Sequence, residues 1–514
     1  MTAGNPDHEV AIIGAGLSGI GMGAALRNAG IEDFVIFERA DDVGGTWRDN
    51  TYPGIGVDIP AFAYQFSYDL KPDWSRFFPK GEEVKRYVDD YVAKYEVKPH
   101  IRFNTEVRSR TWDEGLHLWR LDVGGKEVTA RFVISAIGPF VDPKPVDLDG
   151  VDDFEGKVIH SARWDHDYDL TGKRVAIVGT GASAVQIIPT IAREVERLDV
   201  YQRTPIWVAP KFDPKIPGPL KRLFDRVPAT ERLVRWWTSR VVEMIVVTLP
   251  LNYGRMPVVA RGIEARLKHY VRRAVKDPDL RRELTPRYGL GCKRPAVSNH
   301  YLQAFNRDNV KLVTDPIARV TERGVLTESG VERELDVLVL ATGFRMSFDP
   351  EIFRRTPVRG RDGFDLATDY EQNRLRAYES ISMPRLPNHF MIFGPYGWTG
   401  AAWHVLVQTA STHIVRVLGE ARRRGATHVE VSEEATNHYH AKIMERMPKS
   451  VWMQSSCSLA NSYYFDHHGD VPYMRPTSGR EAQRAARSFP LEDYRYWAPA
   501  RGDAEAADAE SIAA

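Results

Sequence analysis

The sequence contains few of the features that mark secreted, nucleic-acid-binding or membrane-spanning proteins. Its 514 residues include two cysteines, Cys292 and Cys457, and two thiols so far apart in the chain do not form a disulfide framework. We therefore expect a reduced, cytoplasmic protein. Basic and acidic side chains nearly balance, at 70 and 69, so we expect neither nucleic acid nor an anionic membrane as the main partner.

Long apolar runs are also missing. The most apolar stretch, VVEMIVVTLPL near Val241, is interrupted by Glu243 and Pro250 and is too short to cross a bilayer. We interpret it as a core helix, with contact at a membrane interface as the alternative. The first residues, MTAGNPDHEVAIIGAG, have no basic region before an apolar core, so we expect no signal peptide and no stable membrane anchor.

A glycine-rich loop near the start predicts a nucleotide site. Val10 to Ile13 form an apolar run typical of a buried parallel strand, and Gly14, Gly16 and Gly19 follow at the G-x-G-x-x-G spacing. These glycines permit a tight turn, close approach of a pyrophosphate, and close packing of helix on strand. A second strand, FVIFE, ends at Glu38, whose carboxylate suits the hydroxyls of an unphosphorylated ribose.

A second glycine-rich loop repeats this plan with one difference. The segment KRVAIVGTGASAVQIIPTIA again predicts strand, turn and helix, with Gly179, Gly181 and Ala184 at the turn. The following strand leads to Arg203 and Thr204 at the place that Glu38 takes in the first unit. An arginine and a hydroxyl favour a 2′-phosphate, so we expect NADP here. The alternative is that Arg203 is an ordinary surface residue.

Two such units in one chain favour electron transfer from a nicotinamide to a flavin. The sequence therefore predicts an α/β fold with two Rossmann-like dinucleotide-binding domains, one for FAD and one for NADP, and a helical insertion. The segments VISAIGPF and DVLVLATGF fit strands at which the chain passes from one nucleotide-binding domain to the other. The expected boundaries are 1–143 and 342–514 for the FAD domain, 144–210 and 286–341 for the NADP domain, and 211–285 for the insertion.

The insertion lacks a nucleotide pattern and shows helical spacing of apolar and charged residues, as in ERLVRWWTSRVVEMIV. We expect it to cover part of the active site, with Trp236 and Trp237 in the core rather than at a substrate. The small, acidic tail RGDAEAADAESIAA is typical of disorder.

Three motifs then resemble one known family. The segment FEGKVIHSARWD fits the fingerprint F-x-G-x-x-x-H-x-x-x-W of the type I Baeyer–Villiger monooxygenases, within the class B flavoprotein monooxygenases. Its matching residues are Phe154, Gly156, His160, Trp164 and Asp165. A second pattern is met by Gly44, Gly45, Trp47, Tyr52, Pro53, Gly54 and Asp58, and the segment GCKRPAVSNHYLQAF resembles the region with the family's active-site lysine and arginine. The likeness extends from about Val10 to Pro472.

The resemblance implies an NADPH- and O2-dependent enzyme that converts ketones to esters or lactones through a C4a-peroxyflavin, with side activity on sulfides. A peroxide anion needs a fixed cation and shielding from water, and an arginine keeps its charge. Arg294 is the candidate catalytic residue, paired with and positioned by Asp58. His160 and Trp164 are interpreted as motif residues at a hinge between the domains, and not as proton carriers.

The same resemblance implies the cofactor contacts, and no metal is expected among them. The predicted FAD contacts are Gly14, Gly16, Gly19, Glu38, Thr46, Trp47, Asp58, Tyr64 and, through its backbone, Val107. The predicted NADP contacts are Gly179, Thr180, Gly181, Ser183, Arg203, Thr204 and Lys293.

Departures from the family pattern leave alternatives open. Asp165 stands where proline is frequent, and the C-terminal segment SYYFDHHGDVP differs from the tryptophan-bearing loop of the cyclohexanone-type enzymes. The runner-up is an N- or S-oxygenating flavin monooxygenase. A dithiol disulfide reductase is disfavoured because the two cysteines are far apart in the sequence, and a non-enzymatic flavin sensor is a remote alternative. The ketone and the oligomeric state cannot be predicted from these residues.

Overall fold

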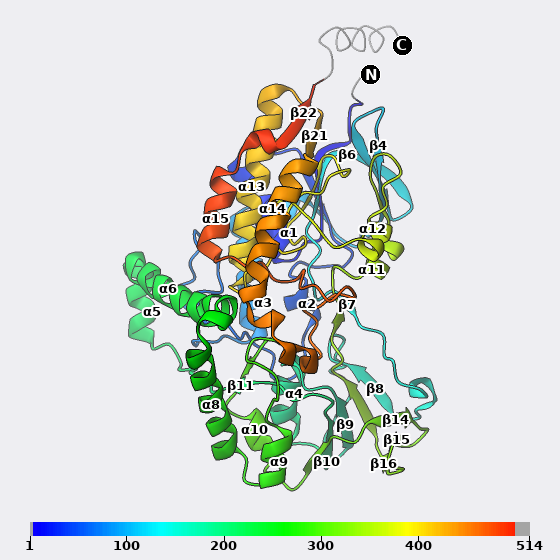
Figure 1. The fold of residues 1–514 in the computed structure, drawn as a ribbon, viewed down its shortest axis with the longest axis vertical. Helices are drawn as coiled ribbons and strands as arrows, with labels where there is room; N and C mark the ends of the chain where they lie inside the picture. The colour runs from blue at the N-terminus through cyan, green and yellow to red at the C-terminus, as the bar shows by residue number, and fades with distance from the viewer. Residues whose placement is uncertain (1–3, 499–514) are drawn as a thin grey trace.

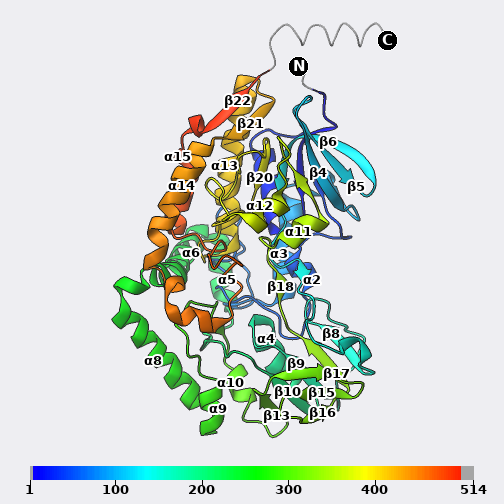
Figure 2. The same ribbon diagram turned by 45° about the vertical axis from the view of Figure 1, so that its right-hand side comes forward.

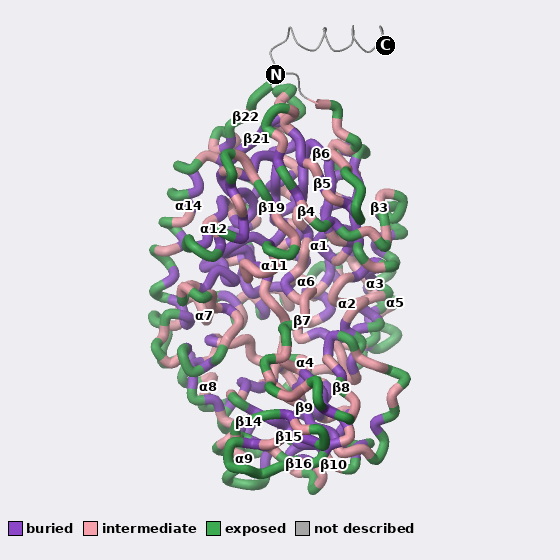
Figure 3. Tube along the Cα trace, turned by 90° about the vertical axis from the view of Figure 1, so that its right-hand side faces the viewer, coloured by how far each residue is buried: buried purple, intermediate pink, exposed green. Residues whose placement is uncertain are grey.

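The protein is described by a computed structural model that covers residues 4–498. Two sheets form two lobes, one above the other in Figures 1 and 2, and helices cover both. Buried residues gather along the strands of both sheets and the helices packed on them (Figure 3). The predicted tail, 501–514, lies outside the described residues.

The larger sheet belongs to the upper lobe and is built from three separate parts of the chain. Its central strand β1 pairs in parallel with β2 and β6, with Val10 opposite Phe34 and Phe132. Every residue of β2 and the last four of β1 are buried, as expected for a strand covered on both faces. The strands are β1 His8–Ile13, β2 Phe34–Phe37, β3 Ile101–Arg102, β4 Val107–Asp113, β5 Leu118–Val123, β6 Lys126–Ser135, β19 Val358–Arg359 and β20 His389–Met391.

The second sheet, in the lower lobe, has five strands in the order β13-β10-β9-β17-β8 and is parallel throughout. It uses residues from 157 to 340, so the chain leaves the upper lobe and later returns to it. The strands are β8 Lys157–His160, β9 Arg174–Val178, β10 Arg197–Tyr201, β13 Val310–Val313 and β17 Val337–Leu340. A short three-stranded sheet of β14 Ile317–Val320, β15 Gly324–Thr327 and β16 Glu332–Glu334 lies at its end.

One helix of the lower lobe holds the lobes together. Helix α4 (Ala182–Ile191) presents Gln186, whose amide donates to the Gly56 carbonyl at 2.9 Å and accepts from the Gly56 N–H at 3.1 Å. Gly54, with φ +85°, lies so close that an added Cβ would come within 2.6 Å of the Gln186 carbonyl oxygen. The glycine of the Y-P-G pattern is therefore required by this lobe-to-lobe contact.

The predicted insertion is helical. It contains α5 Gly218–Arg226, α6 Pro228–Val242, a π-helical turn η3 Glu243–Thr248, α7 Leu249–Leu251, α8 Pro257–Ala274 and α9 Pro278–Glu283. Helices α5 and α6 project from the side of the molecule where the lobes meet (Figure 1).

The core position predicted for the most apolar part of the insertion is wrong. Trp236 and Trp237 are 53% and 59% exposed, and Val241 within VVEMIVVTLPL is 46% exposed. The periodicity correctly predicts a helix, but this helix has more apolar residues than its buried face can accommodate, so the others are exposed. Among residues 4–498, no helix is long and apolar enough to cross a membrane.

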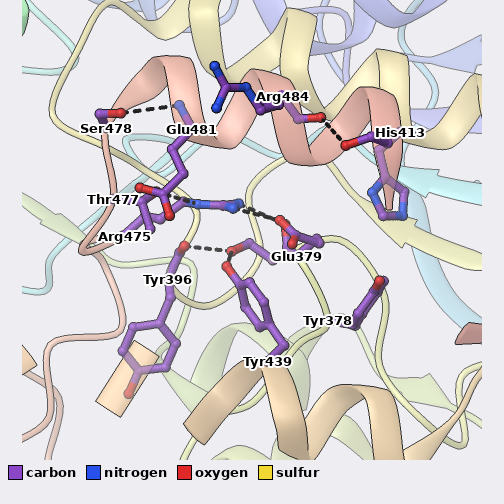
Figure 4. Close-up of polar contacts among 12 residues, drawn as sticks. Tyr378, Glu379, Tyr396, His413, Tyr439, Arg475, Thr477, Ser478, Glu481 and Arg484 are labelled. Atoms are coloured by element: carbon purple, nitrogen blue, oxygen red, sulfur yellow. Dashed lines mark hydrogen bonds and ion pairs between the residues drawn. The ribbon is translucent and has the colours of Figure 1, made fainter. Parts of the chain in front are cut away.

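The remaining long helices, α1 Leu17–Asn28, α3 Gly81–Lys94, α13 Trp403–Arg424, α14 Glu433–Arg446 and α15 Gly479–Ser488, belong to the upper lobe. A buried ion pair lies beneath α15 (Figure 4): Arg475 donates to Glu379 at 2.6 Å, with side chains 4% and 13% exposed. The Arg475 guanidinium also donates to Thr477 and lies over the Tyr439 ring at 5.5 Å.

The two cysteines are joined, contrary to our expectation. Cys292 and Cys457 form a disulfide across a sequence separation of 165 residues, with Cα atoms 5.0 Å apart. Distance along the chain does not set distance in the fold, so the separation of the two cysteines in the sequence does not indicate a reduced protein. The disulfide links the segment before Arg294 to the 3₁₀ helix Ser455–Ala460.

Candidate active site

The first glycine loop forms a cradle at the N-terminus of α1. Gly14 has φ +102°, a conformation that side chains rarely adopt, and a Cβ added at Gly19 would lie 1.8 Å from the Gly14 carbonyl oxygen. The Glu38 carboxylate accepts from the Ala15 N–H at 2.7 Å and is 5% exposed. Backbone donors and a carboxylate at a helix N-terminus are the groups that bind a dinucleotide's pyrophosphate and ribose.

The glycines after Glu38 lie against this cradle. A Cβ on Gly45 would lie 3.2 Å from the Gly16 Cα. The helix α2 (Thr46–Asp49) follows, and the Trp47 indole donates to the Tyr64 hydroxyl at 3.0 Å. Tyr64 packs edge-on against His404, a fully buried histidine whose pKa burial lowers to about 3, so that its ring is neutral at physiological pH. Thr46, Trp47 and Tyr64 thus share one side of the cradle.

Val107 begins strand β4 and is 7% exposed. Its register with Val123 places it at the end of the β4–β5 hairpin.

The second glycine loop has the same form at the N-terminus of α4. Gly179 has φ +114°, and a Cβ there would lie 2.5 Å from the Ala341 carbonyl oxygen. Gly181 is the N-cap of α4. The Thr180 hydroxyl donates to the Thr204 carbonyl at 2.9 Å, which ties the loop to the strand end. Burial raises the pKa of Tyr52 to about 12 despite a hydrogen bond with Ser183, so the upper lobe reaches this loop.

Lys293 and Arg203 are near enough for their positive charges to repel. The pKa of Lys293 is lowered, chiefly by burial and further by the nearby charge of Arg203. No carboxylate is among the groups that shift it. Two close positive charges without an acid favour a doubly charged anion such as a 2′-phosphate.

We therefore expect Arg203→Ala to raise KM for NADPH at least about tenfold while KM for NADH changes little, since an arginine–phosphate contact contributes on the order of 1.5–3 kcal/mol. Steady-state NADPH and NADH oxidation by one preparation measures both. Arg197→Ala, at the start of β10 just before Arg203 but paired with Asp199, is the matched control. An equal rise in KM for NADPH and NADH would contradict a role for Arg203 in binding the 2′-phosphate.

Asp58 and Arg294 meet where the lobes join. The Arg294 Nε donates to one oxygen of Asp58 at 2.7 Å and its Nη2 to the other at 2.8 Å. The guanidinium lies over the Trp398 ring, 4.9 Å from its centre. Burial by itself raises the pKa of Asp58 and lowers that of Arg294, but their mutual attraction outweighs it, so Asp58 falls below and Arg294 rises above its usual pKa. The pair is ionised across the physiological range.

Several residues around this pair were not singled out from the sequence. Tyr463, Tyr464 and Tyr473 pack on one another, Tyr473 also packs on Trp398, and burial raises the pKa of each tyrosine. They form an apolar wall beside the Arg294 guanidinium. The aromatic run in NSYYFD is the only signal in the sequence that marks part of this wall.

Two fingerprint residues, Trp164 and Asp165, border a cleft between the lobes and not the Asp58–Arg294 pair. The cleft has a volume of about 940 Å³ and is lined by Trp164 and Asp165 from one lobe and Arg39, Arg48 and Arg108 from the other. His160 accepts through Nδ1 from the Ala162 N–H at 3.1 Å, and burial lowers its pKa.

Two other fingerprint residues, Phe154 and Gly156, pack together. Phe154 is 8% exposed, and a Cβ on Gly156 would lie 2.4 Å from its ring. Asp165 pairs with Lys157 at 2.6 Å.

Comparison with known proteins identifies the family. The family model described as pyridine nucleotide-disulphide oxidoreductase matches residues 11–224. A Baeyer-Villiger monooxygenase of Streptomyces coelicolor is 37% identical over 513 residues, which covers 98% of this chain and 96% of that protein. The chain belongs to the Baeyer–Villiger monooxygenase family. A second member, from Pseudomonas aeruginosa, is 38% identical over 92% of this chain and 86% of its own.

Solved structures support this family assignment. The structure of OTEMO in complex with FAD and NADP has a TM-score of 0.85 and 26% identity, covering 96% of this chain and 100% of that one. Cyclohexanone monooxygenase from Rhodococcus sp. Phi1, bound to NADP+, has a TM-score of 0.82. The predicted fold class and family are confirmed. Family membership, and not cysteine spacing, sets aside the dithiol reductase.

Proposed function

We propose that this Baeyer–Villiger monooxygenase converts ketones to esters or lactones with NADPH and O2, and oxygenates sulfides as a side activity. The observation that carries the proposal is the bidentate Asp58–Arg294 pair beside Trp398. FAD and NADP fit the two glycine cradles, Glu38 suiting the FAD ribose and Arg203 with Lys293 the 2′-phosphate. The domain division follows the boundaries given above, with 1–143 and 342–514 holding FAD.

When bound in the first cradle and reduced by NADPH, FAD would supply the chemistry that transfers one atom of O2 to the substrate. The chain supplies a fixed positive charge. Arg294 keeps its proton because Asp58 holds it from one side, and its remaining N–H groups are free to donate to a developing oxyanion. The tyrosine wall and Trp398 cover part of this charge and limit its contact with water, which strengthens its effect; the Arg294 side chain is 20% exposed.

A product analysis tests the proposal. The FAD-loaded enzyme is mixed with NADPH in air, first with a panel of cyclic, aryl and open-chain ketones and then with a thioether. We expect NADPH-dependent ester or lactone from at least one ketone, and sulfoxide in smaller yield. Sulfoxide or N-oxide without ester from any ketone would assign the chain to the N- or S-oxygenating alternative.

A further inference from the structure

Helix α6 and the π-helical turn η3 carry a continuous stripe of exposed apolar side chains. Every member is between 46% and 59% exposed and they recur at helical spacing on one side. This outer stripe consists of Leu233, Trp236, Trp237, Val241, Met244 and Ile245. Single exposed apolar residues are common, but six in one row on one helix are not.

The opposite side of the same helix is fixed to the upper lobe, so the stripe cannot turn inward. Glu231 is 1% exposed and accepts from Gln65 at 2.9 Å, and Glu243 accepts from the Gly479 N–H at 2.7 Å. Val247 is 1% exposed, and a Cβ on Gly400 would lie 2.9 Å from the Val246 carbonyl oxygen. The helix already has a buried face, and the outer stripe is a second, unpartnered one.

Charge indicates which partner fits. Residues 218–274, from α5 to α8, contain twelve basic and four acidic side chains, although the whole chain is nearly balanced at 70 and 69. Two of the four acids, Glu231 and Glu243, are turned toward the upper lobe by the bonds given above. Six of the twelve basic side chains lie on α5 and α6 themselves. The two helices that carry and flank the stripe are therefore basic, while the chain outside residues 218–274 carries more acidic than basic side chains.

We propose that the outer stripe docks reversibly on an anionic lipid surface, with α6 lying in the plane of the headgroups. An exposed row of tryptophan and aliphatic side chains among arginines is the pattern of an interfacial helix. Tryptophan prefers the headgroup region, and each basic residue near an anionic leaflet adds attraction. A second copy of the chain fits less well, because stripe-to-stripe pairing brings two basic surfaces together.

Vesicle flotation of the FAD-loaded enzyme tests this proposal. We expect binding to vesicles of equal parts phosphatidylcholine and phosphatidylglycerol, and little binding to phosphatidylcholine alone. Trp236→Ser/Trp237→Ser should weaken partitioning at least about tenfold. The flavin spectrum, thermal unfolding and NADPH oxidation should stay as in the wild type, because neither tryptophan belongs to the proposed active site.

The matched control is Val331→Ser/Leu459→Ser, which removes two side chains that are 48% and 59% exposed outside α5–α8. It should bind vesicles like the wild type. Equal binding by the tryptophan variant, or equal binding to neutral vesicles, would overturn the proposal. So would a dimer in lipid-free sedimentation that the tryptophan variant abolishes, since the stripe would then be an interface between copies.

Discussion

Replacing Arg294 by alanine is expected to reduce ester formation by about 10²–10³-fold or more, because the variant loses a preorganised charge aimed at a developing oxyanion. Reduction of the flavin by NADPH should continue, since the glycine cradles and Arg203 are untouched. Anaerobic stopped-flow absorbance measures flavin reduction, and gas chromatography measures the ester. The variant should consume NADPH without matching product, since the reduced flavin still reacts with O2.

Arg294→Lys separates charge from geometry. A lysine keeps a positive charge but cannot donate to both oxygens of Asp58, so we expect partial activity between wild type and alanine. Arg120→Ala, on the inner strand β5 with its side chain 39% exposed, is a control for loss of an arginine that pairs with acids elsewhere. Ester formation by Arg294→Ala at the wild-type rate would remove Arg294 from its proposed role.

Arg475→Ala is expected to lower the free energy of unfolding by about 3–5 kcal/mol, the usual cost of leaving one member of a buried ion pair without its partner. Glu379, 13% exposed, would lose the guanidinium that compensates its charge (Figure 4). The backbone N–H of Arg475 donates to the Trp398 carbonyl at 2.7 Å, so the ion pair adjoins the loop that carries Trp398. Chemical denaturation followed by flavin release and circular dichroism measures the loss.

The double replacement Arg475→Met/Glu379→Met is the informative control. Removing both charges while keeping the volume should restore most of the stability, because no buried charge is then unpaired. If the double variant is as unstable as Arg475→Ala, packing over Tyr439 rather than charge accounts for the effect. A single variant as stable as the wild type would contradict the expectation.

The local patterns of the two nucleotide units could be predicted because each is short and periodic. The glycines at 14, 16 and 19 and the acid at Glu38 belong to one strand–turn–helix–strand segment, and the structure brings them together at one helix end. The pairing of Asp58 with Arg294 spans 236 residues and was available only through the family resemblance. Its contact with Trp398 was not foreseen, because no local pattern marks Trp398.

Two predictions failed for the same physical reason, which is that sequence proximity and hydropathy do not report tertiary position. Cys292 and Cys457 are far apart in the chain and bonded in the fold. Trp236 and Trp237 are apolar and exposed, because the inner face of α6 and η3 is already filled by Glu231, Val242 and Val247. Because the inner face carries the buried Glu231, a count of hydrophobic residues wrongly indicates that this face is the solvent-exposed one.

Gln186 gives helix α4 two tasks at once. The N-terminus of α4 forms the second glycine cradle. The Gln186 side chain of the same helix makes two hydrogen bonds with the backbone of Gly56, two residues before Asp58. Any rotation of the lower lobe against the upper must therefore carry residues 54–58 along or break those hydrogen bonds. If nucleotide binding at α4 rotates the lower lobe, its occupancy and the orientation of the Asp58 carboxylate would be thermodynamically linked. The linkage would be reciprocal, so that stabilising the Asp58–Arg294 pair would change the affinity for that nucleotide by the same factor.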